Sequence, residues 1–407
     1  MFKTPANINR ISQNLSRVAP SATMAVTQTA RQMKAEGLDV IGLGAGEPDF
    51  DTPDHIKEEA YRAIKDGKTN YTNVDGIPEL KEQIAIKFQR DNGLSYAESQ
   101  INVSPGGKPV LYNALMATLD PGDEVIIPAP CWVSYPEMVR LAGGTPVVLP
   151  CTGANGFKLT PAQLDAAITT KTRWLMLNSP SNPTGAGYSR EELAGLGEVL
   201  SRHPHVLILT DDIYEHLVYD GFQFSTIAQV VPELYERTLT MNGVSKAYAM
   251  TGWRIGYGAG PEWLIKAMAK VMSQSTSNPC SISQWASVAA LSGPHDFLKE
   301  WNKAYTARRN YVVGALNALD GLTCQTPIGA FYVYPDCADW IGKKTRQGTL
   351  LATDVEVAKA LLTEAHVALV PGTAFHGAPN LRLSYAADLQ TLKTACARIT
   401  NFASTLS

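Results

Sequence analysis

Short runs of apolar residues recur through the middle of the chain, separated by turn residues and amphipathic stretches. Runs that are apolar at nearly every position are typical of strands covered on both faces of a sheet. They predict strands at residues 101–103, 124–130, 145–150, 173–178, 206–210, 238–242 and 255–260.

Helical patterns lie between some of these runs. Residues 108–119 follow a Gly-Gly turn, and residues 189–201 open with Ser-Arg-Glu-Glu, the pattern of a capping box. Alternating strands and helices predict an α/β fold with a largely parallel sheet.

The pattern changes near residue 295. A charged helix is expected at 295–319, then the apolar segment PIGAFYVYP, a helix at 354–365, and the segments VALVPG and LRLSYA. This order predicts a smaller α+β domain. Since the first 50 or so residues add no obvious buried strand, we expect a large domain at 54–294 and a small domain formed by 1–53 and 295–407.

Composition excludes several classes of protein. Of 407 residues, 45% are hydrophobic and 18% are charged, which is ordinary for a globular chain. The net charge of −3 and the lack of a basic tract argue against nucleic acid as a partner. Six scattered cysteines without a C-x-x-C pair predict free thiols and no metal site. With no signal peptide and no long apolar run, we expect no membrane segment and a cytoplasmic location.

Two glycine-rich segments are candidates for ligand loops. The segment GLGAG at 42–46 lacks a third glycine at the spacing that opens a helix in a dinucleotide loop, and Pro48 and Pro53 prevent a helix from following it. The segment SPGGK at 104–108 joins a predicted strand to a helix N-terminus, where free amides favour a phosphate. An ordinary turn is the alternative for this second segment.

Polar residues also follow two predicted strands. In open α/β sheets ligands bind beyond the carboxyl ends of strands, where Asn182 of the segment NPTG would lie unless that segment is only a stiff turn. Asp211 follows the apolar run VLILT, and a carboxylate there is costly unless it meets a cation such as a protonated pyridine nitrogen. Capping of a following helix is the alternative for Asp211.

Three basic residues stand in apolar surroundings. Lys246 lies among Ala, Tyr and Met, where burial would lower its pKa and make a nucleophilic amine available, although any single lysine can also be a surface residue. Arg254 offers a planar fork for a phosphate. Arg382, inside an apolar strand pattern, requires a buried anion, for which a substrate carboxylate and an internal salt bridge fit equally well.

The order and spacing of these motifs are more specific than any one of them. Y-T-x-x-x-G from Tyr71 to Gly76, GGK, NPTG, DDIY, Ser-Lys and the late LRLSYA together resemble the class I aminotransferases. AGEPDFDTP, PAPCWVSYPEM and AMTGWRIGY are similar to the bacterial aspartate aminotransferase subgroup. The resemblance runs from about residue 14 to the end of the chain.

This resemblance implies a pyridoxal-phosphate-dependent transferase of fold type I. Such an enzyme has a large domain with a mixed, mostly parallel seven-stranded sheet, a smaller α+β domain, and two active sites shared across a homodimer. It would move an amino group between an amino acid and a 2-oxo acid by a ping-pong mechanism.

The resemblance also implies roles for residues around the cofactor ring. Lys246 would bind the cofactor as a Schiff base and then move protons. Asp211 would pair with the pyridine nitrogen, and Tyr214 and Asn182 would hydrogen-bond the ring hydroxyl oxygen. Trp132 would stack on the ring, and both Trp132 and Asn182 would contact substrate.

Other residues would bind the phosphate and the substrate carboxylates. Gly106, Gly107, Lys108 and Arg254 would hold the phosphate, and Tyr71 would reach the phosphate in the neighbouring subunit. Arg382 would bind the substrate α-carboxylate, with Gly46 nearby. Lys108, together with Ser21 and Thr23, would recognise a distal carboxylate, which favours aspartate, glutamate, 2-oxoglutarate and oxaloacetate as substrates.

Four positions depart from the family's usual pattern. Gly243 stands where many members have serine, Cys131 where tyrosine is usual and Pro109 where glutamine is usual. Ala19 stands where prephenate-using relatives carry lysine, which argues against prephenate as a substrate.

An aminotransferase for aromatic or neutral amino acids is the main alternative on this scaffold. A lyase or decarboxylase of the same fold shares the residues around the cofactor. A non-catalytic cofactor-sensing module, as in some transcription regulators, would need a DNA-binding domain, but only about a dozen residues precede the match and no basic footprint is present.

Overall fold

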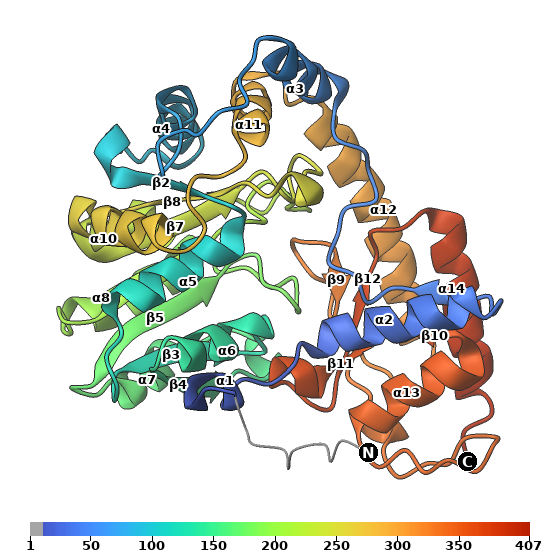
Figure 1. The fold of residues 1–407 in the computed structure, drawn as a ribbon. Helices are drawn as coiled ribbons and strands as arrows, with labels where there is room; N and C mark the ends of the chain where they lie inside the picture. The colour runs from blue at the N-terminus through green and yellow to red at the C-terminus, as the bar shows by residue number, and fades with distance from the viewer. Residues whose placement is uncertain (1–10) are drawn as a thin grey trace, which may run out of the picture.

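The computed structural model describes residues 11–407 and contains a seven-stranded sheet of order β2-β8-β7-β6-β5-β3-β4 (Figure 1). Its strands are β2 (Ile101–Ser104), β3 (Glu124–Ala129), β4 (Thr145–Pro150), β5 (Thr172–Asn178), β6 (Leu207–Asp211), β7 (Thr238–Gly243) and β8 (Gly256–Ala259). The seven predicted strands are confirmed, each to within one residue at either end.

The direction of one strand makes this sheet mixed. β8 runs antiparallel to both β2 and β7, whereas every other neighbouring pair is parallel. The predicted mixed, mostly parallel sheet is therefore confirmed. Because β5, β6 and β7 are adjacent and parallel, their carboxyl ends meet at one edge of the sheet.

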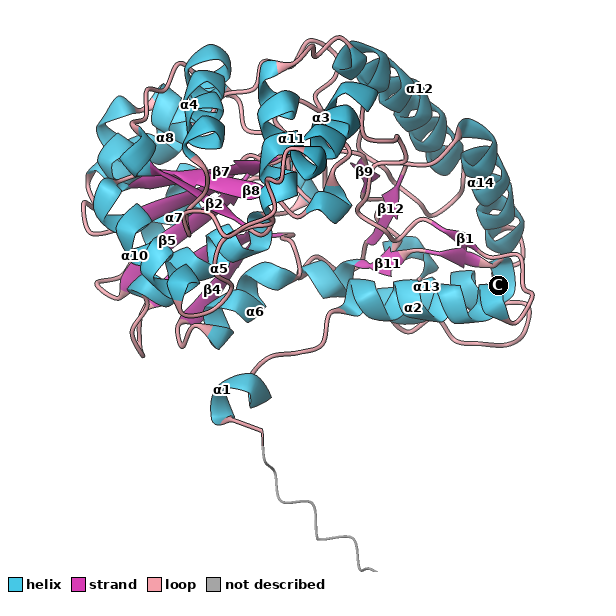
Figure 2. Ribbon diagram, turned by 45° about the horizontal axis from the view of Figure 1, so that its top comes forward, coloured by secondary structure: helices cyan, strands magenta, loops and turns pink. Residues whose placement is uncertain are grey.

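Helices cover both faces of this sheet (Figure 2). Alternating residues of β5 show this division, since Trp174 and Met176 pack with residues of α5, whereas Leu175 and Leu177 pack with residues of α8. The helices before and around the sheet are α3 (Asp54–Lys65), α4 (Pro78–Asn92), α5 (Gly107–Thr118), α6 (Ser134–Leu141), α7 (Pro161–Ala167), α8 (Arg190–Ser201), α9 (Ile227–Val230), α10 (Glu262–Ser273) and α11 (Ser281–Ser292). The predicted capping box of α8 is confirmed, because the Ser189 hydroxyl accepts from the Glu192 amide and the Glu192 carboxylate accepts from the Ser189 amide at 2.8 Å.

The C-terminal part contains a second, three-stranded antiparallel sheet of order β11-β12-β9. Its elements are α12 (Phe297–Asn317), β9 (Tyr332–Val333), α13 (Asp354–Ala365), β10 (Val367–Ala368), β11 (Val370–Pro371), β12 (Leu381–Ser384) and α14 (Leu389–Ala403). The helix predicted at 354–365 is confirmed at both ends, and the one predicted at 295–319 is two residues shorter at each end.

Within the N-terminal segment, α2 (Ala22–Ala35) and β1 (Ile41–Gly42) pack against this C-terminal part, on the right in Figure 1, whereas α1 (Gln13–Ser16) lies near α6 beside the large sheet. β1 pairs in parallel with β10. Ala30 of α2 is buried with Leu362 and Ala368. The domain boundaries at residues 53/54 and 294/295 stay a prediction.

None of the helices within residues 11–407 is both long and apolar enough to cross a membrane. All six cysteines are free; five are buried, and Cys280 is exposed.

Candidate active site

The predicted catalytic residues meet where β5, β6 and β7 end. The sheet register places Asn178 beside Asp211, and Asp211 beside Met241 of β7. Lys246 follows three residues after the end of β7. The strands therefore bring Asp211 and Lys246 to the edge where ligands bind in sheets of this type.

A cavity of about 470 Å³ opens at this edge. Ten of the twelve predicted site residues line it, so residues far apart in sequence converge as expected. They are Gly46, Gly107, Lys108, Trp132, Asn182, Asp211, Tyr214, Lys246, Arg254 and Arg382. Gly106 is buried beside the cavity against Arg254, and Tyr71, which is 90% exposed, does not line it.

Lys246 carries an amine of lowered basicity. Burial lowers the pKa of Lys246 to about 8, Arg254 and Arg382 also lower it, and Glu47 and Asp211 act in the opposite direction. Its Nζ donates a hydrogen bond to the Gly46 carbonyl at 2.5 Å. A substantial fraction of such amines is neutral near pH 8, as a base or nucleophile requires.

Asp211 is a buried carboxylate held in a fixed orientation. The Tyr135 hydroxyl donates to its Oδ2 at 2.6 Å and the Ile213 amide to its Oδ1 at 3.3 Å. Burial raises the pKa of Asp211 to about 6, although both hydrogen bonds and Lys246 favour the charged form. The alternative that Asp211 caps a following helix is wrong, because the next helix in the chain, α9, begins only at Ile227.

Arg382 is a buried cation without a matching anion. Its Nη1 donates to Asn182 Oδ1 at 2.8 Å and its Nη2 to the Gly44 carbonyl at 2.5 Å, whereas Nε has no partner. No salt bridge to Arg382 forms among residues 11–407, so the alternative of an internal salt bridge is wrong. Burial lowers the pKa of Arg382, and an added carboxylate would offset that cost.

The N-terminus of α5 forms part of the wall of the cavity, through Gly107 and Lys108. Gly106 has a φ of 103°, and a Cβ there would lie 2.3 Å from Arg254 Nη2. The Arg254 guanidinium thus lies directly against the glycine turn that begins α5. Free helix-terminal amides and an adjacent guanidinium form a suitable phosphate site.

Lys108 lies beside Trp132 in the wall of the cavity. Lys108 Nζ is 4.9 Å from the centre of the Trp132 ring. Burial lowers the pKa of Lys108, and the charge of Arg254 lowers it further. Thr23 of α2 also lines the cavity and hydrogen-bonds the Ser21 hydroxyl at 2.9 Å.

Comparison with known proteins agrees with this geometry. Residues 38–399 match the family described as aminotransferase class I and II. The chain belongs to the class I and II aminotransferases. It is an enzyme that transfers amino groups, as its motifs predicted, and members of this family use pyridoxal phosphate.

Close relatives cover nearly the full length of this aminotransferase. It is 61% identical to the aspartate/prephenate aminotransferase of Cereibacter sphaeroides, over 98% of this chain and 99% of that one. It is similar to the crystal structure of the aspartate aminotransferase from Rhizobium meliloti, with a TM-score of 0.95 and 55% identity over 98% of this chain and 100% of that chain. It is also similar to the Thermus thermophilus aspartate aminotransferase solved with maleate, with a TM-score of 0.91 and 44% identity over 97% and 100% of the two chains.

Two tyrosines of the aminotransferase site escaped the sequence analysis. Tyr135 lies three residues after Trp132 in the segment PAPCWVSYPEM, and Tyr332 lies in PIGAFYVYP. Tyr214 and Tyr332 hydrogen-bond through their hydroxyls at 2.8 Å, and the Arg382 guanidinium lies 4.6 Å from the Tyr332 ring centre. Their only sequence signal was an aromatic residue inside a family motif, which core packing explains equally well.

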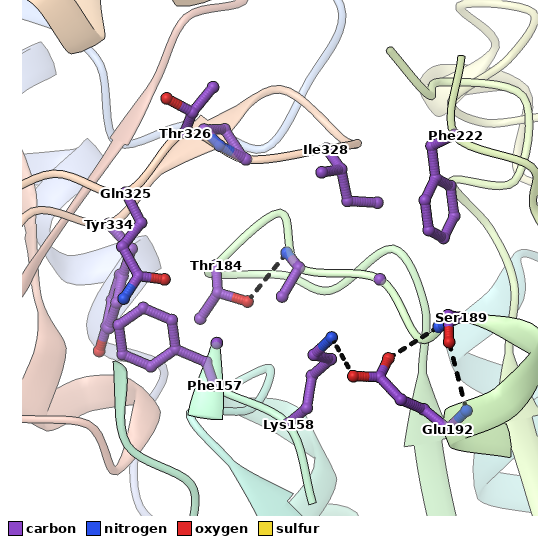
Figure 3. Close-up of a pocket in the computed structure, with 14 residues that line it drawn as sticks. Phe157, Lys158, Thr184, Ser189, Glu192, Phe222, Gln325, Thr326, Ile328 and Tyr334 are labelled. Atoms are coloured by element: carbon purple, nitrogen blue, oxygen red, sulfur yellow. Dashed lines mark hydrogen bonds and ion pairs between the residues drawn. The ribbon is translucent and has the colours of Figure 1, made fainter. Parts of the chain in front are cut away.

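A separate cavity of about 280 Å³ lies behind the NPTG segment (Figure 3). None of the twelve predicted site residues lines it. Its charged groups are paired within the chain, because Lys158 contacts the Glu192 carboxylate, which also accepts from the Ser189 amide (Figure 3). It therefore offers no free charge comparable with those of the active-site cavity.

Proposed function

We propose that this enzyme is an aspartate-type aminotransferase that holds pyridoxal phosphate on Lys246. The observation that carries the proposal is the meeting of three groups in one cavity: the Lys246 amine, the buried Asp211 carboxylate and the Arg382 guanidinium, which lacks an anion. Each of them is unfavourable when buried alone, and a cofactor with an amino acid substrate complements all three.

The residues of the cavity fit the cofactor. Asp211 is a buried carboxylate that forms no salt bridge within residues 11–407, and a protonated pyridine nitrogen would supply a cation. The Arg254 guanidinium lies against the backbone of residue 106, an approach that a Cβ at this position would prevent. Gly107, Lys108 and the start of α5 add amides and positive charge for the phosphate.

Pyridoxal phosphate supplies an electron sink that delocalises the charge left when a bond to the substrate Cα breaks. Asp211 keeps the pyridine nitrogen protonated by its negative charge. Arg382 binds the α-carboxylate and thereby turns the Cα–H bond toward Lys246. The Lys246 amine, with its lowered pKa, would take up the Cα proton and hold it beside the substrate. Tyr214 and Asn182 would hold the cofactor from its hydroxyl side, and Trp132 would pack against it.

Lys108 and Thr23 support dicarboxylic substrates. Both line the cavity, and Lys108 is close to Trp132. The Thermus thermophilus relative was solved with maleate, a four-carbon dicarboxylate. We therefore assign aspartate and glutamate as amino donors and 2-oxoglutarate and oxaloacetate as acceptors.

Prephenate is a second candidate acceptor. The relative that is 61% identical is named an aspartate/prephenate aminotransferase, whereas Ala19 of this chain lacks the lysine expected of prephenate users. Aromatic donors are a further alternative, because the chain is 38% identical to an aromatic aminotransferase of Pyrococcus horikoshii.

A homodimer completes the proposal. Tyr71 is 90% exposed and lies outside its own cavity, so it is free to reach a neighbouring subunit. We assign it to the phosphate of the neighbour's site. The cytoplasmic location stays a prediction.

A panel of amino donors tests the substrate assignment. Cofactor absorbance is followed as each amino acid converts the loaded enzyme, and kcat/KM is then measured with 2-oxoglutarate, oxaloacetate and prephenate. We expect aspartate and glutamate to exceed phenylalanine by at least about tenfold, since a second carboxylate gains a charged partner. A higher kcat/KM for phenylalanine than for aspartate would instead establish the aromatic alternative. The Lys108→Met variant is expected to reduce the ratio of kcat/KM for aspartate to kcat/KM for phenylalanine.

A further inference from the structure

A buried polar network lies below the active site, between the sheet and α4. Lys87 of α4 contacts the Glu215 carboxylate, and the two side chains are only 1% and 3% exposed. Lys87 Nζ also donates to Asn92 Oδ1 at 2.8 Å, and Asn92 Nδ2 donates to Glu215 Oε2 at 2.9 Å. Asn242 Nδ2 donates to Glu215 Oε1 at 2.8 Å.

The ammonium group of Lys87 fills the centre of this network. Asp91, Glu215 and His216 are close enough together to ligate a metal ion, but Lys87 contacts Glu215 and lies 3.9 Å from Asp91. A metal there would have to displace a cation that is already paired. Burial favours the neutral form of Glu215, but Lys87, His216 and the Asn92 amide outweigh it and lower the pKa of Glu215.

Asn242 connects this network to the backbone of both catalytic strands. Its Nδ2 also donates to the Asp212 carbonyl at 3.2 Å, directly after Asp211. Its Oδ1 accepts from the Gly243 amide at 2.7 Å, at the start of the segment that leads to Lys246. The Asn242 side chain thus contacts the backbone at two places. One is Asp212, directly after Asp211, and the other is Gly243, three residues before Lys246.

We propose that Asn242, held by the Lys87–Glu215 pair, is a positioning residue that fixes the distance between the Lys246 amine and the Asp211 carboxylate. The assignment rests on the proposed function of Lys246 and Asp211. Proton transfer to and from a substrate depends on placement of the base within a fraction of an ångström, so a fixed backbone there has a direct effect on rate.

Stability alone does not account for the network. Removing two charges from water is costly, and replacing a buried ion pair by apolar residues of similar size is often neutral or stabilising. The pair instead fixes one geometry, because an amide shared between Glu215 and two backbone groups has a single arrangement that satisfies all of them.

Two variants separate positioning from folding. Asn242→Ala removes the link and leaves the ion pair, whereas Lys87→Met with Glu215→Leu replaces the ion pair by apolar side chains. Lys81→Met is the matched control, because Lys81 lies on the same helix and loses a similar contact, to Asp75 at 2.5 Å, without touching Asn242.

Each variant is measured with its cofactor by kcat, KM and melting temperature. In cofactor-free protein, the pH dependence of Lys246 acylation by an amine reagent is read from the mass of its peptide. Both test variants are expected to lose about 10–100-fold in kcat with KM for aspartate nearly unchanged, as small misplacements of a base produce. Their Lys246 acylation midpoint is expected to rise, because an amine displaced from its buried position loses part of the burial that lowers its pKa.

The double variant is expected to lower the melting temperature, because the buried Asn92 side chain loses both of its partners, so the positioning role is judged from kcat, KM and the acylation midpoint. Kinetics and acylation midpoints equal to those of Lys81→Met would overturn the positioning role. A wild type that binds cofactor but transfers no amino group would contradict the proposed function, and the acylation midpoints would then still decide the positioning role.

Discussion

Burial sets the chemistry of single residues in this site. It lowers the pKa of Lys246 to about 8 and raises that of Asp211 to about 6, so burial moves each group toward its neutral form. Arg382 stays charged and lacks an anion. Groups shifted in this way are typical of functional sites, and their cost is offset when ligands of opposite charge bind.

Asp211→Asn is expected to stabilise the cofactor-free protein while abolishing transamination. Asp211 has a pKa of about 6 when folded, against an ordinary value of 3.8, so between these values the folded state binds more protons and the free energy of unfolding falls as the pH rises. In Asp211→Asn, the free energy of unfolding does not fall in this way, because asparagine does not titrate. It should match the wild type near pH 3.5 and exceed it by up to about 3 kcal/mol at pH 8, measured by urea unfolding.

Asp220→Asn is the control for this pH dependence. The Arg309 guanidinium lowers the pKa of Asp220, so loss of that carboxylate should destabilise the protein at neutral pH and not in strong acid. An Asp211→Asn variant that is less stable than the wild type at pH 8 would contradict the burial argument.

At the scale of elements, glycine turns and strand ends determine where the groups lie. The turn before α5 brings the Gly106 backbone against Arg254, which a side chain at this position would prevent. The carboxyl ends of β6 and β7 set the spacing between Asp211 and Lys246.

Gly106→Ala is expected to weaken cofactor binding. Its φ of 103° strains any L-residue, and its Cβ would lie 2.8 Å from Arg254 Cζ, so the guanidinium must move. Strain of this kind costs about 1–3 kcal/mol, and we expect the cofactor dissociation constant to rise by at least about tenfold in an absorbance titration. Gly252→Ala is the control, since its added Cβ meets nothing within 4 Å. Equal binding by both variants would contradict the phosphate role of this turn.

The sequence predicted elements whose signals are local. Apolar runs located the sheet strands to within one residue, and the capping box at Ser189 located the start of α8. The segments α2, α3 and α4 carried weaker patterns and were not predicted. The link between Asn92 and Glu215 could not be predicted, because it joins residues 123 positions apart and depends on how α4 packs.

At the scale of the whole molecule, both ends of the chain contribute to one site. Thr23 of α2 and Arg382 of β12 line the cavity together with the large sheet, and β1 joins β10. The role of the exposed Tyr71 in a neighbouring subunit stays a proposal.

Mixing two inactive variants tests the shared site. Tyr71→Ala and Lys246→Ala homodimers are each expected to be nearly inactive. After subunit exchange at equal amounts, half of the dimers carry one intact site, so activity should recover to about a quarter of the wild type. No recovery, despite exchange shown by mass spectrometry, would contradict the assignment of Tyr71 to the neighbouring site.

Covalent trapping of the cofactor tests the central claim most directly. The enzyme is loaded with pyridoxal phosphate, reduced with borohydride, digested and analysed by mass spectrometry, with Lys246→Ala treated in parallel. We expect the phosphopyridoxyl mass on the peptide that contains Lys246, none on the peptide that contains Lys108, and no aspartate half-reaction in the variant. A label on another lysine, or retained turnover by Lys246→Ala, would contradict the account.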